Sequence, residues 1–160
     1  MTEAFDNEAG SLGSGPDQVQ FRFRDDEPVG DATLTVDAAL EQPDAAAVRI
    51  EPGDDARDLL EHLGRLSLVE INFPSFADGR GYSAARILRE AGYTGELRAV
   101  GDVLVDQLAH MRRCGFDAFA PDAPMDEAAA KRALGLYDNV YQNAADRRRT
   151  IAELRHWGQT

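Results

Sequence analysis

The sequence predicts an α/β domain of repeated βα units, with a parallel sheet that resembles half of a barrel. Between residues 47 and 138, short apolar runs alternate with helical segments, which is typical of parallel strands joined by right-handed crossovers. Polar and apolar side chains alternate along these strands, which favours helices on one sheet face only. The alternative is a flavodoxin-like sheet, whose two helix-covered faces require nearly continuous apolar strands.

The N-terminal third differs from the rest of the chain. Residues 1–17 are rich in Gly, Ser and acidic side chains, and we expect a disordered acidic tail. A single domain is expected over 18–160, with N-terminal strands in 18–46, βα units in 47–138 and a C-terminal helix in 139–160. Apolar and polar residues alternate in Val19–Arg24 and Thr33–Val36, on either side of a turn-forming stretch. They predict a hairpin or two neighbouring edge strands.

The later elements are bounded by glycine, proline and aspartate. The predicted strands are 47–51, 68–73, 97–101 and 118–120. The predicted helices are 55–63, 82–91, 103–113, one that Pro124 and Asp126 open, and a last one near 146–157. Gly64, Gly92 and Gly115 are expected to end helices, and Ser83 and Asp102 are candidate N-caps.

The chain holds 29 acidic and 17 basic residues, for a net charge of −12. This excludes unaided, non-specific binding to nucleic acid or to an anionic membrane. The first 66 residues carry most of the negative charge, so this region could dock on a basic partner surface. The N-terminus lacks a signal-peptide pattern and no apolar run is long enough to span a membrane, so we expect a cytoplasmic protein.

The polar side chains of the predicted strands share one sheet face. They are Arg49, Glu70, Asn72 and Arg98. An exposed polar face of this kind needs a cover: the N-terminal strands, a second copy of the chain through self-association, or another partner.

Ligands of parallel sheets gather at the carboxyl ends of the strands. Here that edge holds the loop around Arg80 and the segment Gly101-Asp102. The loop could hold an oxyanion, or be a strand-to-helix turn with Arg80 in a salt bridge. Asp102 is an N-cap or a site carboxylate, and Gln107 is a structural link or a site residue. The candidate ligand-binding residues are Asn72, Asp78, Gly79, Arg80, Gly81, Tyr82, Ser83, Arg98, Asp102 and Gln107.

Other chemistry has less support. Gly79–Ala84 matches G-x-G-x-x-[GA], but five residues separate it from the preceding strand, whereas a dinucleotide loop leaves its strand at once. The single Cys114 excludes an internal disulfide and a cysteine-built metal centre, and we expect it to be buried and inert. No cofactor and no metal site are predicted, and no catalytic residue is assigned.

Four segments resemble a bacterial family, domain of unknown function nine-three-four. They are residues 73–90, which include Asp-Gly-Arg-Gly-Tyr-Ser, residues 95–104, which include Gly-Asp-Val-Leu, Asp106-Gln107-Leu108 and 111–119. Members are often labelled oxidoreductases and are typically encoded beside assimilatory sulfite reductase. The resemblance implies a role in sulfate or sulfite assimilation and brings no catalytic residue.

Three functions follow as hypotheses. The leading one is an accessory protein without its own cofactor that docks onto sulfite reductase or its electron donor. The second is a small enzyme or sensor that binds an oxyanion. The third is an NAD(P)- or flavin-dependent oxidoreductase.

Overall fold

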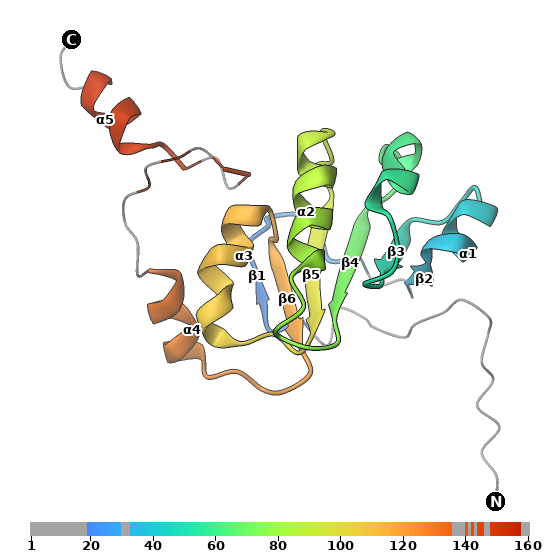
Figure 1. Cartoon of the computed structure of the whole chain (residues 1–160), viewed down its shortest axis with the longest axis horizontal. Coiled ribbons are helices and arrows are strands. Elements are labelled where there is room, and N and C mark those ends of the chain that lie inside the picture. The colour runs from blue at the N-terminus through green and yellow to red at the C-terminus, as the bar shows by residue number, and fades with distance from the viewer. Residues whose placement is uncertain are drawn as a thin grey trace, which may run out of the picture.

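The computed structural model describes residues 19–29, 33–135, 140, 142, 144–145 and 148–157; the predicted tail, 1–17, lies outside them. One sheet holds six strands, in the order β1 (Phe21–Arg22), β6 (Ala118–Pro121), β5 (Glu96–Gly101), β4 (Leu68–Phe73), β3 (Ala47–Ile50) and β2 (Leu34–Thr35) (Figure 1). Strands β2 to β6 are parallel, and β1 is antiparallel to β6. The predicted parallel α/β fold is confirmed, as an open sheet that does not close into a barrel.

The helices alternate with these strands. They are α1 (Val36–Glu41), the 3₁₀ helix η2 (Ala56–His62), α2 (Arg80–Glu90), the 3₁₀ helix η3 (Val105–Gln107), α3 (Leu108–Cys114), α4 (Glu127–Leu134) and α5 (Ile151–Trp157). Asp126 is the N-cap of α4, as predicted, because its carboxylate accepts a hydrogen bond from the amide of Ala129 at 2.8 Å. Gly92 and Gly115 follow α2 and α3 with φ of 94° and 115°, which only glycine adopts freely.

The placement of the N-terminal strands corrects the prediction. A hairpin or a neighbouring pair is wrong, because β1 and β2 lie at opposite edges of the sheet. Strand β2 begins the parallel series and leads directly into α1, which the sequence pattern missed. Thr35 ends the strand and caps the helix, since its hydroxyl accepts from the amide of Ala38 at 3.3 Å.

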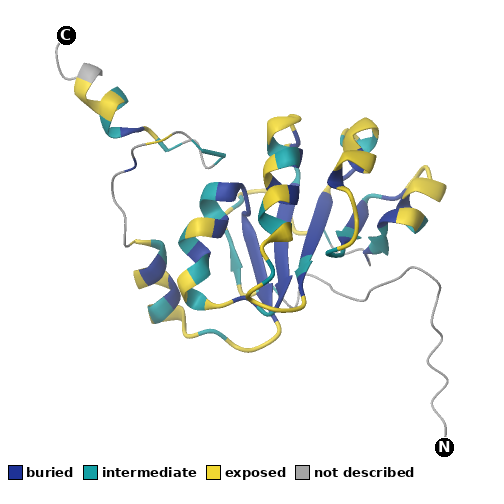
Figure 2. Cartoon of the chain, in the orientation of Figure 1, coloured by how far each residue is buried: buried dark blue, intermediate teal, exposed yellow. Residues whose placement is uncertain are grey.

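One hydrophobic core lies between the sheet and the helices. The parallel strands follow one another in sequence order, so right-handed crossovers put α1, η2, α2 and α3 on the same face (Figure 1). Alternate strand residues such as Val69, Ile71 and Leu97 pack there against Leu59, Leu88 and Met111. Figure 2 shows the central strands as buried and the exposed residues on the outer helix surfaces. No helix in the described part of the chain is long and apolar enough to cross a membrane.

The other face of the sheet is polar, as the alternation predicted. The strand register aligns six residues in one row across all six strands: Thr35, Arg49, Glu70, Arg98, Ala118 and Arg22. Arg98 lies between two acids. Its guanidinium donates to Glu70 Oε1 at 3.0 Å and to Glu96 Oε1 at 2.8 Å, and all three side chains are at most 1% exposed.

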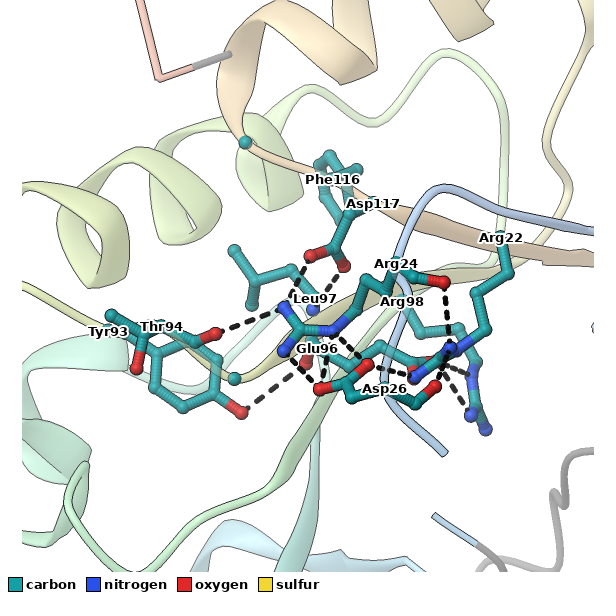
Figure 3. A network of polar contacts seen from close by, with 12 residues as sticks. Arg22, Arg24, Asp26, Tyr93, Thr94, Glu96, Leu97, Arg98, Phe116 and Asp117 are labelled. Carbon is teal, nitrogen blue, oxygen red and sulfur yellow. Dashed lines mark hydrogen bonds and ion pairs between the residues drawn. The ribbon is translucent and has the colours of Figure 1, made fainter. Parts of the chain in front are cut away.

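These ion pairs form part of a longer chain of alternating charges, and Figure 3 shows the part of it that runs from Arg98 to Asp117. We call it the ion-pair chain, and its members in order are Arg49, Glu70, Arg98, Glu96, Arg22, Asp26, Arg24, Asp117 and Arg89. Hydrogen bonds from Arg24 and Arg22 hold the pKa of Asp26 well below its ordinary value, so this link stays charged at neutral pH.

The polar face is therefore not open. Arg22, Arg24 and Asp26 reach it from one edge of the sheet, and Thr33 donates to Glu70 Oε2 at 3.1 Å from the other. Of the three covers the sequence left open, the N-terminal strands supply these contacts.

Replacing Arg98 tests how far the fold depends on the ion-pair chain. Arg98→Met leaves Glu70 and Glu96 as buried anions with one partner fewer, so we expect the free energy of unfolding in urea to fall by about 3 kcal/mol. Arg86→Met is the control, because its pair with Glu90 is exposed and we expect a change below about 0.5 kcal/mol. Adding Glu96→Gln to Arg98→Met should restore part of the loss. Equal losses from Arg98→Met and Arg86→Met would contradict the role given to the chain.

Candidate functional site

The carboxyl ends of β4 and β5 are joined directly. The amide of Asp102 donates to the carbonyl of Phe73 at 2.7 Å. Gly101 has φ of 95°, and a Cβ at that position would collide with the Phe73 carbonyl and the Asn72 side chain. A glycine is required here for the two strand ends to come this close.

Two side chains bind the main chain of Phe76, in the loop after β4. Asp102 Oδ2 accepts from the Phe76 amide at 2.9 Å, and Gln107 Nε2 donates to the Phe76 carbonyl at 2.8 Å. The same Gln107 amide accepts from the Leu104 N–H at 3.1 Å through Oε1. Gln107 is therefore a structural link, from η3 to a neighbouring loop. The prediction of Asp102 as a helix N-cap is wrong, because its carboxylate turns to this loop and Leu104 takes the N-cap position of η3.

The two main-chain segments bridged by Gln107 carry exposed apolar side chains. Phe76 is 51% exposed and Leu104 is 37% exposed. We call these two residues the Phe76–Leu104 patch. Its backbone hydrogen bonds are supplied from within the protein, so the side chains are presented to solvent on a fixed support.

Asp78 and Arg80 pair with each other at the start of α2. Their side chains approach to 2.6 Å, and Asp78 Oδ1 also accepts from the Arg80 amide at 3.1 Å. These hydrogen bonds, the side-chain one first, lower the pKa of Asp78 to about 2. Since α2 already begins at Arg80, the prediction of Ser83 as N-cap is wrong; Ser83 is an exposed residue of the first turn. An internal carboxylate thus occupies the place proposed for an oxyanion.

Of the two glycines around Arg80, Gly81 has a packing explanation. A Cβ on Gly81 would lie 2.6 Å from Cζ of Phe73, so α2 contacts the end of β4 through this glycine. The neighbouring Tyr82 ring stacks edge-on against Phe73 with centroids 5.4 Å apart. Gly79 has ordinary negative φ and open space around it. Gly81 is therefore needed for α2 to pack closely against β4.

The structure does not bring all of the candidate residues together. Asn72 Nδ2 donates to Glu51 Oε2 at 2.7 Å, on the β3 side of the edge. Arg98 lies in the buried row of the polar face, bound to Glu70 and Glu96, and away from Arg80. The candidates thus divide among the Asp102–Gln107 support, the Asp78–Arg80 pair, the Asn72–Glu51 contact and the ion-pair chain.

A groove of about 730 Å³ opens at the opposite, amino-terminal end of the sheet, where the sequence predicted nothing. Its lining includes Phe23, Arg86, Arg89, Arg112 and Asp117. Arg89 donates to the carbonyls of Tyr93, Gly95 and Gly115, and Arg112 donates to the carbonyl of Phe116. These two arginines lie in the last turns of α2 and α3 and hold the segments that follow the helices. The only sequence signal for them was arginine in the last turn of each helix.

Cys114 is buried, as predicted, and burial raises the pKa of its thiol. Its Sγ lies 3.8 Å from Nε2 of His110, one helical turn earlier. A thiol with a raised pKa stays protonated at neutral pH, so this pair is not an activated nucleophile. Among the described residues, no group of three or more His, Cys, Asp and Glu side chains is arranged to hold a metal ion.

The titration of Asp78 tests the loop geometry. Because its folded pKa of about 2 lies below the ordinary 3.8, the carboxylate should still be ionised at pH 3, where an unperturbed aspartate is mostly protonated. Carboxyl-carbon NMR measures this directly. In Arg80→Gln the midpoint should move up toward 3.8, while Arg57→Gln should leave it unchanged. A wild-type midpoint near 3.8 would show that Asp78 and Arg80 are not paired in solution.

Comparison with known proteins identifies the family but no characterised relative. A search of curated proteins gave no match, and neither did a search of solved structures. A family model described as "Bacterial protein of unknown function (DUF934)" matches residues 47–152, which is about two thirds of the chain. This range contains the strands β3 to β6, the ion-pair partners Glu70 and Arg98, and the Phe76–Leu104 patch. The chain therefore belongs to the DUF934 family of bacterial proteins of unknown function.

Proposed function

We propose that this protein is an accessory factor of sulfate and sulfite assimilation that docks onto sulfite reductase or its electron donor and carries no cofactor of its own. The pathway rests on the resemblance to a family encoded beside assimilatory sulfite reductase. The docking role rests on one observation, the support of Phe76 and Leu104 by the side chains of Asp102 and Gln107.

The polar groups next to Phe76 and at the start of α2 bind other parts of the protein itself. Asp102 and Gln107 hold the main chain of Phe76, and Asp78 holds Arg80. A catalytic site needs polar groups directed at a substrate, whereas this edge directs an aromatic ring outward. Exposed aromatic residues on rigid supports dominate many protein–protein interfaces, since little entropy is lost when they bind.

An oxyanion-binding enzyme or sensor is the second candidate, because the Arg80 side chain is two-thirds exposed at the start of α2. An anion there must compete with Asp78 for the guanidinium. Calorimetric titration with sulfite and sulfate distinguishes the candidates: binding that Arg80→Ala abolishes supports the oxyanion function, and no heat of binding contradicts it.

Docking is tested with the purified partners. We expect the protein to form a complex with either the sulfite reductase hemoprotein or its electron donor at micromolar concentration, measured by isothermal titration. Phe76→Ser should weaken the complex about thirtyfold, as loss of a central aromatic contact costs about 2 kcal/mol. Leu40→Ser, which alters a leucine on α1 that is as exposed as Leu104, should change the affinity less than about twofold.

Two results would contradict the proposal. One is the absence of a complex with either partner, together with unchanged sulfite reduction in cells that lack the gene. The other is equal weakening by Phe76→Ser and Leu40→Ser, which would remove the Phe76–Leu104 patch from the interface.

A further inference from the structure

The edge that carries the Phe76–Leu104 patch is strongly acidic. Four segments leave the carboxyl ends of β3, β4, β5 and β6: residues 51–55, 74–79, 102–107 and 122–126. Together they hold eight acidic residues and no basic residue: Glu51, Asp54, Asp55, Asp78, Asp102, Asp106, Asp122 and Asp126. We call this surface the acidic edge. Parallel strands bring these segments to one side of the molecule although they lie far apart in sequence.

Helix capping explains some of these acids but not the total charge. Asp55 and Asp126 cap η2 and α4, and Asp78 bonds to the first amide of α2. Each helix N-terminus supplies roughly half a positive charge, so the four helical segments offset about two of the eight negative charges. Arg80 and Arg57, which pair with Asp78 and Asp55, offset two more and leave about four. A net negative field therefore remains in front of this edge.

In the order of the strands, the segments that carry Asp54 and Asp122 flank the two segments that carry the apolar patch. Asp106 lies two residues after Leu104, and Asp54, Asp106 and Asp122 are exposed. The segment that carries Asp122 is fixed by Gln20, which donates to the carbonyl of Ala123 and accepts from the amide of Met125 at 2.9 Å. The edge thus combines an apolar centre with an acidic rim, the arrangement of a protein-binding surface.

We propose that the acidic edge binds a protein whose docking surface has a basic rim around an apolar pocket. This inference rests on the proposed docking function and adds the chemistry of the partner. A second copy of the chain is the wrong occupant, because a symmetric dimer would bring eight acids against eight. A small oxyanion or a phosphate-bearing surface is repelled by the same field. A basic partner gains from it both in encounter rate and in orientation.

Charge variants at matched positions test the inference. The edge variant is Asp54→Asn, Asp106→Asn and Asp122→Asn. The control variant removes the same charge near the amino end of the sheet, through Glu41→Gln, Asp44→Asn and Glu90→Gln, all exposed. At low ionic strength, we expect the edge variant to associate with the sulfite reductase hemoprotein or its donor about tenfold more slowly than wild type, and the control variant less than about twofold more slowly. High salt should remove the difference.

Carbodiimide cross-linking gives an independent readout, because it joins carboxylates to lysine amines in contact. This chain has a single lysine, Lys131, so products that link its carboxylates to lysine come almost entirely from the partner. We expect the partner's lysines to be joined to Asp54, Asp106 and Asp122. Products at Glu41 and Asp44 in their place would overturn the inference.

The outcomes separate this inference from the docking function. A complex that forms with salt-independent rates, or equally well with edge and control variants, overturns the acidic edge and leaves docking intact. The absence of any complex overturns both. A wild-type dimer that Phe76→Ser dissociates also overturns the inference, since the patch would then be covered by a second copy.

Discussion

The fold depends on the buried guanidinium of Arg98, which lies between two buried carboxylates. A sheet with helices on one face must close its other face by other means, and here alternating charges do so. Each buried ion of the central trio has a partner on either side, so none is left uncompensated in a medium where an unpaired charge costs several kcal/mol. The arrangement also fixes the strand register, because a slip of one residue would turn Arg98 into the apolar core.

The direction of the helices gives the two ends of the sheet different charges. Every βα unit sends the amino end of its helix toward the carboxyl edge. There Asp55, Asp78 and Asp126 accept N–H groups at the start of η2, α2 and α4. The carboxyl ends of α2 and α3 lie at the opposite end, where Arg89 and Arg112 donate to carbonyls of the segments that follow the helices. The acidic edge and the arginine-lined groove are thus two results of one topology. The side chains of the polar sheet face pair with one another. The ends of the sheet and the outer helix faces are therefore the surfaces left for contacts with other molecules.

Much of this architecture follows from sequence because it rests on periodicity. Apolar and polar residues alternate from Val69 to Phe73 in β4, and the polar Glu70 and Asn72 predicted a sheet with helices on one face only. The order of the strands in the sheet cannot be predicted from periodicity. The two short N-terminal strands pair with different neighbours because Arg22 and Arg24 find acids near β5 and β6, and no local pattern encodes partners seventy to a hundred residues away. The same holds for the candidate site. An aspartate at 102 and a glutamine at 107 could bind a ligand or link two segments of the chain, and only their hydrogen bonds to Phe76 show that they form a link.

The position of β1 has a consequence for how the chain folds. Phe21 pairs with Phe119, so β1 cannot pair during synthesis until β6, the last strand of the sheet, has been made. The parallel units between them pair with sequence neighbours and can assemble as the chain emerges, each at low loop-closure cost. Until β1 docks, Glu96 lacks Arg22 and Asp117 lacks Arg24. Completion of the ion-pair chain is therefore the late, non-local step of folding. The slow phase of folding should report the docking of β1 rather than the packing of the helices.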